Sequence, residues 1–267
     1  MPAHVSTRPR IAIPMPHASD TQYALRAIPQ YERAVVLAGG TPVRIALDGN
    51  RSKIRDLIEN CDGVLLPGSK ADVDPARFHA VRSPKTAAAD PRRDEVDNLL
   101  LEDADRLGKP VLGICYGLQS LNVYRSGSLI QHIPDALPEE TRTKVNHEAG
   151  GKVPVAHSVE IDSESLLGRI LGSDSRSRLS GPAKPGKGSK TTLPVNSSHH
   201  QSADAIGDGL RIIARCPDDG IIEALEGAAD DHFVLAVQWH PERSVDQDEA
   251  SRQIFRAFLQ AAASRAR

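Results

Sequence analysis

The sequence predicts an α/β protein: a three-layer αβα sandwich with a central, mostly parallel sheet that antiparallel strands extend. In the first half of the chain, apolar strand-like segments alternate with helix-like segments. This order builds a parallel sheet with helices on both faces. In the second half, strand-like segments follow one another with one clear helix among them, which favours an antiparallel or mixed extension of the same sheet.

The first half is expected to contain four strands and three helices. Gly63–Leu66 is apolar throughout, as a parallel strand buried on both faces would be. Gly39 and Gly40 end the first helix, and Pro29 either disturbs its first half or marks its true start. The expected strands are residues 10–13, 42–47, 63–66 and 110–114, and the expected helices are 24–37, 54–61 and 94–107.

The second half is expected to add strands around one low-complexity segment. We expect strands at 154–161, 210–216, 220–225 and 233–239, with helices at 163–171 and about 246–263. Residues 172–194 are rich in Ser, Gly, Lys and Arg, so they can bury little apolar surface and are predicted to form a flexible loop. Because strand-like segments continue on both sides, we interpret residues 1–267 as a single domain.

Composition excludes several classes of protein. The net charge of −2 argues against a nucleic-acid binder held by a basic surface. The sequence contains no apolar run of about 18 residues, so no membrane span is predicted. Residues 1–10 lack the apolar core of a signal peptide. The cysteines, Cys61, Cys115 and Cys216, form no CxxC pair, so a reducing cytoplasm is the simplest expected location. The oligomeric state stays open, a homodimer included.

The segment Gly113-Ile114-Cys115-Tyr116-Gly117 indicates a nucleophile. A strand should end before Cys115 and a helix begin after it, and the flanking glycines remove Cβ atoms that would crowd such a turn. The helix N-terminus stabilises a thiolate, and the N–H of Tyr116 is placed to bind an oxyanion. The alternative, a small buried apolar cysteine, suits Cys61 and Cys216, which lack this context.

The segment Gln238-Trp239-His240-Pro241-Glu242 supplies a base and a carboxylate. On an extended backbone, His240 and Glu242 share one side of the chain, and Pro241 keeps His240 extended. Taken alone, the segment could be a strand terminus with a capping carboxylate. With the cysteine turn, it predicts a catalytic triad of Cys115, His240 and Glu242 that attacks an amide carbonyl without a metal or other cofactor.

Together, these motifs resemble the class I glutamine amidotransferase-like superfamily, and nearly the whole chain is similar to its γ-glutamyl-γ-aminobutyrate hydrolase family. The most family-specific segments are Val195–Gln201 and Asp219–Ala224, and Leu66–Pro75 matches the family's glycine loop. The resemblance implies a flavodoxin-like fold, a small-molecule γ-glutamyl amide substrate, and no nucleic-acid or membrane partner.

The resemblance also implies roles for residues outside the triad. Gly68 and Ser69 belong to a loop whose Ser69 N–H would be the second oxyanion donor, and Gln119 would face the γ-glutamyl group. The segment His199, His200 and Gln201 would lie near the glutamyl α-carboxylate and amine. Each has a structural alternative: an ordinary turn for the loop, a surface helix position for Gln119, and a polar turn with a structural histidine for the segment.

The chain departs from the family at two places, and the first bears on specificity. The family usually has arginine after the nucleophile, whereas this chain has Tyr116, whose side chain would border the leaving-group channel. Ser126-Gly127 replaces a glycine pair.

Three hypotheses of function follow from the motifs and the resemblance. The first is a hydrolase that releases glutamate and an amine through a cysteine thioester. Its amine could be γ-aminobutyrate, a polyamine or another amino compound, so polyamine catabolism is one expected setting. The others are a glutaminase subunit that supplies ammonia to a separate synthase, and a non-catalytic binding protein on the same fold.

Overall fold

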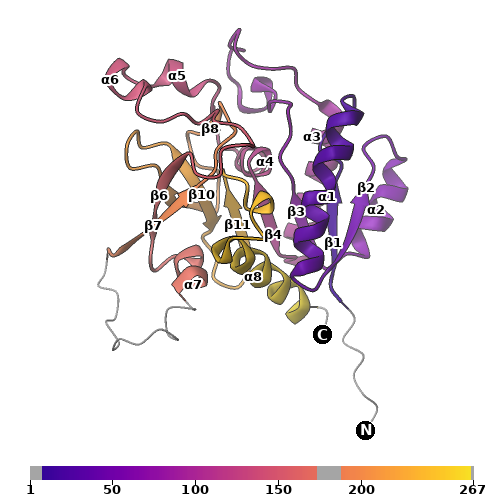
Figure 1. The fold of residues 1–267 in the computed structure, drawn as a ribbon. Coiled ribbons are helices and arrows are strands. Elements are labelled where there is room, and N and C mark those ends of the chain that lie inside the picture. The colour runs from indigo at the N-terminus through magenta and orange to yellow at the C-terminus, as the bar shows by residue number, and fades with distance from the viewer. Residues whose placement is uncertain (1–7, 173–187, 266–267) are drawn as a thin grey trace, which may run out of the picture.

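The computed structural model describes residues 8–172 and 188–265, and their main feature is one mixed sheet. Its nine strands lie in the order β2-β1-β3-β4-β11-β10-β9-β6-β7 (Figure 1). Neighbouring strands from β2 to β11 pair in parallel, and those from β11 to β7 pair antiparallel. The predicted fold class is therefore confirmed, with a flavodoxin-like strand order in the parallel half.

The elements of the parallel half alternate along the chain as predicted. Their bounds are β1 Arg10–Pro14, α1 Thr21–Leu37, β2 Thr41–Ile45, α2 Arg51–Glu59, β3 Gly63–Leu66, η1 Pro75–Phe78, α3 Pro91–Leu107, β4 Val111–Ile114 and α4 Tyr116–Tyr124. The Asp20 side chain caps α1 by accepting from the Tyr23 N–H at 2.9 Å. Since α1 continues through Pro29, that proline neither begins nor ends the helix.

The rest of the chain supplies the antiparallel half and a closing helix. The bounds are β5 Leu129–Ile130, α5 Ile133–Ala136, α6 Glu139–Arg142, β6 His157–Asp162, α7 Leu166–Gly172, β7 Lys190–Val195, β8 Ser202–Ala203, β9 Leu210–Arg215, β10 Ile222–Gly227, β11 Val234–Val237, η3 Pro241–Arg243 and α8 Glu249–Arg265. Strands β5 and β8 pair in a separate small sheet. Among the described residues, no helix combines the length and apolar character needed to cross a bilayer.

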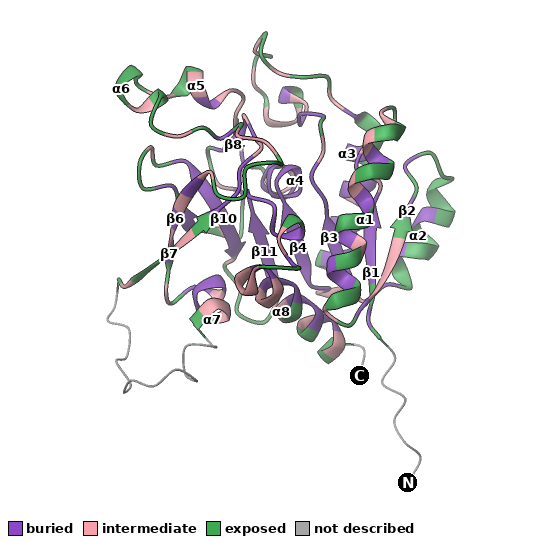
Figure 2. Cartoon of the chain, in the orientation of Figure 1, coloured by how far each residue is buried: buried purple, intermediate pink, exposed green. Residues whose placement is uncertain are grey.

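The strands of the parallel half are buried on both faces. Ile11 and Ile13 of β1 belong to the core that α1, α7 and α8 share with the sheet, whereas Ala12 belongs to the core under α2, α3 and α4. This alternation is the period of two expected of a strand. Figure 2 shows the central strands as buried ribbons, with exposed residues on the outer sides of the helices. The helices therefore form the two outer layers of the sandwich.

The flexible loop was predicted for residues 172–194, and both of its predicted ends are wrong because they belong to regular elements. Gly172 belongs to α7, and Lys190–Val195 form β7, which pairs with β6 at the edge of the sheet. This strand was missed because Lys190, Thr191 and Thr192 face solvent, so no apolar run marks it. Residues 173–187 of the predicted loop lie outside the described residues.

The topology brings three loops to one edge of the sheet. Strands β3, β4 and β11 are parallel neighbours, so their carboxyl ends lie side by side. Cys115 follows β4 directly, and Gly68 and His240 lie within three residues of the ends of β3 and β11. In open α/β sheets, ligands bind outside the carboxyl ends of the strands. The fold thus joins the two chemical motifs although they are far apart in the sequence.

Candidate active site

Cys115 occupies a strained turn between β4 and α4. Its backbone has φ 53° and ψ −104°, a conformation that is rare for a residue with a side chain. The Cys115 N–H donates to the Val237 carbonyl at 2.8 Å, which fixes the turn against the end of β11. The side chain is 5% exposed. Strain held in this way is typical of a nucleophile elbow.

The glycines around Cys115 are required by close backbone approach. A methyl group added at Gly117 would lie 2.2 Å from the Leu66 carbonyl oxygen, and one at Gly113 would lie 2.9 Å from backbone atoms of Gly117. The glycines let β3, β4 and the start of α4 touch, while the positive φ falls on Cys115 itself. The predicted reason for the glycine pattern, crowding by Cβ atoms, is thus confirmed.

The first amides of α4 have no partner in the helix, as at any helix N-terminus. Within the described residues, the N–H groups of Tyr116 and Gly117 donate to no protein group. They follow Cys115 directly, so they contribute positive potential where a thiolate or an oxyanion would form.

His240 and Glu242 are paired as predicted, but the backbone conformation that pairs them differs from the predicted one. His240 Nδ1 lies 2.7 Å from Glu242 Oε1, and both side chains are buried. The expectation of an extended backbone is wrong beyond His240, because Pro241–Arg243 form the 3₁₀ turn η3. Proline suits the first position of such a turn, since its φ is preset and it has no N–H to satisfy. The turn carries the carboxylate back to the imidazole.

The sequence did not single out Asn196, which holds the backbone of His240. The His240 N–H donates to Asn196 Oδ1 at 3.0 Å, and Asn196 Nδ2 donates to the His240 carbonyl at 2.9 Å. Asn196 follows β7 directly. Its segment was recognised as family-specific, but no residue pattern indicated this contact.

Charges at the triad favour a protonated imidazole. Burial lowers the pKa of His240, but the negative charges of Glu242 and of the Cys115 thiolate outweigh it and raise that pKa to about 9. Burial raises the pKa of Glu242, but the His240 cation outweighs it and the net direction is downward. An imidazolium beside a thiol is the arrangement that activates catalytic cysteines.

The loop after β3 contacts the other side of the triad. A methyl group added at Gly68 would lie 3.0 Å from His240 Cε1 and 3.7 Å from Cys115 Cβ. The Gly68 N–H donates to the Tyr31 hydroxyl at 3.0 Å, so it is already committed. The Ser69 N–H donates to no group among the described residues, which leaves this amide available to a ligand.

A cavity of about 250 Å³ opens at Cys115. Every predicted substrate-contact residue lines it except Gly68, which lies next to Cys115. The lining residues are Ser69, Lys70, Ala71, Asp72, Cys115, Tyr116, Gln119, Glu148, Gly150, Ser198, His199, His200 and Gln201. A larger hollow of about 580 Å³ lies around the amino ends of β4 and β11 and includes no triad residue. The chemistry therefore places the candidate site at the smaller cavity.

Gln119 and the segment after β7 form one hydrogen-bonded wall. Gln119 is buried, which rules out the surface-helix alternative, and its Nε2 donates to the Gln201 carbonyl at 3.1 Å. His200 Nε2 lies 3.0 Å from Asp72 Oδ2. His199 Nδ1 lies 2.9 Å from the Gln201 carbonyl, and its other ring nitrogen faces Glu223. The wall is thus polar and internally braced.

Tyr116 is fixed in the protein rather than free to reach into the cavity. Its side chain is 1% exposed, and its hydroxyl donates to Asp94 Oδ1 at 2.7 Å. The Arg93 guanidinium lies 4.8 Å from the centroid of the tyrosine ring. Tyr116 is nevertheless among the residues that line the cavity, and its place beside a leaving-group channel stays a prediction.

Arg93 is a second supporting residue that the sequence did not identify. It is fully buried, pairs with Asp97 at 2.7 Å, and donates from Nη2 to the Pro67 carbonyl at 2.8 Å. It therefore links α3 to the loop that carries Gly68. A charged residue in the first turn of a helix is ordinarily exposed, so its sequence position gave no signal of this role.

One buried group beside the cavity could hold a metal ion. The donor atoms of His147, His157, His199 and Glu223 all lie within 4.8 Å of one another. The sequence predicted no metal site, because the cysteines form no CxxC pair and the expected reaction needs no metal.

The family profile described as peptidase C26 matches residues 11–242. The chain belongs to the peptidase C26 family. Among related proteins, this C26 chain is 30% identical to a glutamine amidotransferase-like protein of Rickettsia prowazekii, over 90% of this chain and 89% of the relative. It is 31% identical to a γ-glutamyl-γ-aminobutyrate hydrolase of Escherichia coli K12, over 87% of this chain and 84% of the relative. The predicted family resemblance is confirmed.

Solved structures agree on the fold of this C26 member. A GMP synthase protein of Thermoplasma acidophilum aligns with a TM-score of 0.55 at 17% identity, covering 96% of this chain and 95% of that chain. PurLQS of Thermotoga maritima aligns with a TM-score of 0.53 at 18% identity, covering 95% and 99%. At these identities the likeness establishes the shared architecture. The C26 family membership and the hydrolase among the relatives support a hydrolase.

Proposed function

We propose that this protein hydrolyses γ-glutamyl amides of small amines, with Cys115 as nucleophile, His240 as acid and base, and Glu242 as the group that orients His240. One observation carries the proposal: the strained Cys115 turn lies next to the buried pair of His240 and Glu242, beside a polar cavity. The atoms His240 Nδ1 and Glu242 Oε1 of this pair are 2.7 Å apart. The similarity to a γ-glutamyl-γ-aminobutyrate hydrolase supports the choice of acyl group.

In the first half of the reaction, the Cys115 thiolate attacks the γ-carbonyl carbon. The developing oxyanion is bound by the N–H groups of Tyr116 and Ser69, both of which are free of protein partners in the described residues. Protonated His240 then gives its proton to the leaving amine, and the C–N bond breaks. The amine departs and leaves a thioester between glutamate and Cys115.

In the second half, a water molecule replaces the amine. Neutral His240 removes a proton from that water as it attacks the thioester carbonyl, and the same two N–H groups bind the second oxyanion. Collapse of the intermediate breaks the C–S bond and releases glutamate. The bond to Glu242 keeps the imidazole oriented in both halves, as in other triads.

The cavity offers both signs of charge to the glutamyl head group. Asp72 and Glu148 are suited to its α-ammonium, and Lys70 and His200 to its α-carboxylate. The hydrogen bond and the charge of Asp72 raise the pKa of His200, which favours its cationic form. A zwitterionic head group therefore fits this lining better than a simple acyl chain does.

A second candidate is a glutaminase that passes ammonia to a synthase. It is favoured by the relative of Rickettsia prowazekii, which is named a glutamine amidotransferase-like protein. Tyr116 does not separate the two candidates, because its ring is buried and bound to Asp94. A cytoplasmic location, a homodimer and a place in polyamine catabolism stay predictions.

The test is a glutamate-release assay that offers γ-glutamyl-γ-aminobutyrate, γ-glutamylputrescine and free glutamine side by side. We expect turnover of at least one γ-glutamyl amide. Cys115→Ala should lower that rate on the order of 10³-fold or more, because the nucleophile is removed. Cys61→Ala is the matched control, since Cys61 is also buried but lies outside the cavity, and it should keep the wild-type rate.

Three results would count against the proposal. Unchanged turnover by Cys115→Ala would exclude the thiol mechanism. Efficient turnover of glutamine alone, particularly when it needs a partner protein, would favour the glutaminase. Binding of γ-glutamyl amides without turnover by the wild type would favour a non-catalytic binding protein.

A further inference from the structure

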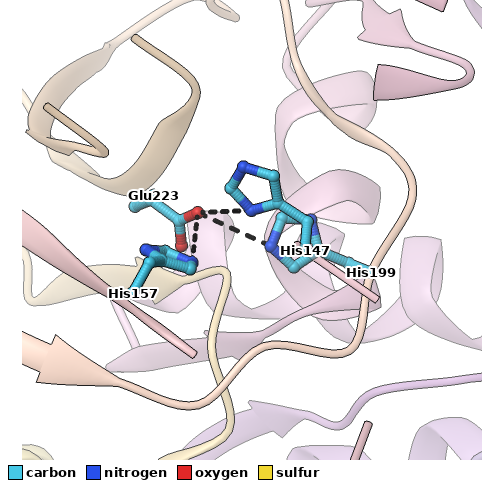
Figure 3. A group of neighbouring side chains, drawn as sticks. All are labelled: His147, His157, His199 and Glu223. Carbon is cyan, nitrogen blue, oxygen red and sulfur yellow. Dashed lines mark ion pairs between the residues drawn. The ribbon is translucent and has the colours of Figure 1, made fainter. Parts of the chain in front are cut away.

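We propose that His147, His157, His199 and Glu223 form a site for one divalent transition-metal ion, with Zn²⁺ as the best-fitting ion. The site would lie in the wall behind the cavity of Cys115. Figure 3 shows the three imidazoles gathered around the Glu223 carboxylate, each joined to it by an ion pair. All four side chains are buried. Three imidazoles and one carboxylate are ligands that zinc accepts.

The distances match a tetrahedral metal site better than they match hydrogen bonds. Glu223 Oε1 lies 3.4 Å from His147 Nδ1, 3.4 Å from His157 Nε2 and 3.5 Å from His199 Nε2. Ligands about 2.0–2.1 Å from a central zinc are separated by about 3.3 Å along the edges of a tetrahedron. N–H···O bonds are shorter, at about 2.9–3.0 Å. All four donor atoms lie within 4.8 Å of one another, so a bound ion would draw the imidazole nitrogens closer together to complete the tetrahedron.

The donor atoms that face one another have no hydrogen-bond partner. Among the described residues, this holds for His147 Nδ1, His157 Nε2, His199 Nε2 and both carboxylate oxygens of Glu223. Buried polar atoms are nearly always hydrogen-bonded, because desolvating them without a partner costs free energy. Five such atoms in one cluster therefore point to a cation held among them, bound by one atom of each side chain.

The opposite nitrogen of each imidazole already has an oxygen partner. His147 Nε2 lies 2.8 Å from Asp219 Oδ2, His199 Nδ1 2.9 Å from the Gln201 carbonyl, and His157 Nδ1 3.2 Å from the Ser158 carbonyl. Metal-binding histidines characteristically donate their second N–H to such an oxygen, which fixes the tautomer and the ring orientation. The cluster thus has the outer contacts of a metal site as well as its donors.

A neighbouring group of side chains is a weaker candidate for the same ion. His147, Cys216 and Asp219 also lie within 4.8 Å of one another. In that group His147 would bind through Nε2, which is already bonded to Asp219. The donors without partners lie on the Glu223 side of the ring, so the ion belongs there.

The closed set of four protein ligands indicates a structural ion rather than a catalytic one, because no position is left for water or substrate. The ion would join β6 through His157, β10 through Glu223, and the segment after β7 through His199. His199 and Gln201 line the cavity, so the ion would brace that wall. His199 would then act as a metal ligand instead of contacting substrate.

The experiment measures metal in the full-length Cys115→Ser chain, whose lost thiol removes the competing soft ligand in the cavity. Protein stripped with a chelator is titrated with Zn²⁺ and with Co²⁺, followed by elemental analysis and by visible absorption of tetrahedral Co²⁺. We expect about one ion per chain and a higher Tm with Zn²⁺. Adding His157→Ala or Glu223→Gln to this chain should abolish both effects.

Matched controls separate this site from its neighbours. Cys216→Ser and His232→Ala, each in the same Cys115→Ser chain, should keep one ion per chain. Absence of stoichiometric Zn²⁺ or Co²⁺ binding by the Cys115→Ser chain itself would overturn the proposal, whether or not the other variants fold. Loss of binding in Cys216→Ser, with retention in Glu223→Gln, would also overturn it. None of these readouts depends on hydrolase activity.

Discussion

Single atoms limit what the candidate site tolerates, and Gly68 is the clearest case. Its Cα faces His240, Cys115 and the Tyr31 hydroxyl, and its N–H is already bonded to that hydroxyl. No other residue type fits without moving one of these groups. A glycine beside a nucleophile is easily attributed to loop flexibility, but here it provides space.

Gly68→Ala should therefore lower kcat with little loss of stability. The new methyl group would lie 3.0 Å from both His240 Cε1 and Tyr31 Oη, so the loop and the Ser69 N–H must shift. Loss of one oxyanion donor typically lowers the rate about 10²–10³-fold. Steady-state kinetics and urea unfolding of the same preparation measure both effects. Gly172→Ala, whose methyl group would meet no atom of the described residues within 4 Å, should leave both nearly unchanged.

His240 should make folding stability depend on pH. Its pKa is about 9 in the folded protein against an ordinary value of 6.5, so the native state binds this proton more tightly than the unfolded chain does. The resulting stabilisation is complete below pH 6.5 and is lost as the pH rises through 9. Urea unfolding of wild type and His240→Gln across this range should show a difference that shrinks with rising pH.

Subtracting the His240→Gln curve removes other groups that titrate in the same range. His147 is one of them in the metal-free protein, since burial lowers its pKa but Asp219 and Glu223 raise it to about 9. Glu242→Gln, which removes the charge that raises the pKa of His240, should move the decline to lower pH. A wild-type advantage that stays constant or grows with pH would contradict the direction of this shift.

At the scale of elements, the junction of β4 and α4 explains why the cysteine segment could be interpreted from sequence. A strand, a strained residue and a helix follow one another without a loop, and close contact with β3 requires glycine at position 117. Local sequence therefore carries most of the information about this turn. The junction is also the least adaptable part of the sheet.

Gly117→Ala should destabilise the fold by at least about 3 kcal/mol, the upper end of the cost of overpacking a core. The methyl group would lie 2.2 Å from the Leu66 carbonyl oxygen, and backbone atoms on both sides must move. Urea unfolding measures the loss, with Gly172→Ala as the control. A change below about 1 kcal/mol would show that the junction relaxes easily, against the interpretation given above.

Elements differ in how well the sequence predicted them. Buried strands such as β3 were located to the residue, because an apolar run between turns allows few alternatives. The edge strand β7 was missed, since its exposed lysine and threonines look like loop residues. The η3 turn was also missed, because Pro241 is compatible with an extended chain and with the first position of a helical turn.

At the scale of the molecule, Arg93 connects two loops of the carboxyl edge to α3. It lies inside the protein, pairs with Asp97, and donates to the carbonyls of Pro16 and Pro67. The loops after β1 and β3 are thereby tied to α3. The buried charge thus sets how the loops at the carboxyl edge are arranged.

Arg93→Ala should lower the free energy of unfolding by about 3–5 kcal/mol, because it leaves the Asp97 carboxylate buried and unpaired. The exposed neighbour provides a control, and Arg92→Ala should change little. The double variant Arg93→Met with Asp97→Leu should recover much of the stability, since an apolar pair often replaces a buried ion pair at little cost. Its kcat should stay low, because Pro67 has still lost its anchor. Full activity of the double variant would show that Arg93 does not position this loop.

The candidate site could be predicted only where local sequence sets the geometry. The flanking glycines marked Cys115 as a candidate nucleophile. His240 and Glu242 could be paired because they are two residues apart in the sequence. Asn196, Arg93 and the His147 cluster depend on contacts between distant segments, which no spacing in a single sequence reveals. The contacts that hold the Tyr116 ring could not be predicted for the same reason, since its partners Arg93 and Asp94 lie on another helix.

The position of β11 has a consequence for synthesis of the chain on the ribosome. This strand is the last of the described strands along the chain, yet it lies between β4 and β10, in the middle of the sheet. Until it emerges, the nascent chain holds its thiol beside an unpaired apolar strand edge, which is a template for aggregation. His240 arrives with the same segment that closes this edge. Completing the sheet and completing the triad are therefore one late event, and a nascent chain that lacks β11 carries the nucleophile without its base.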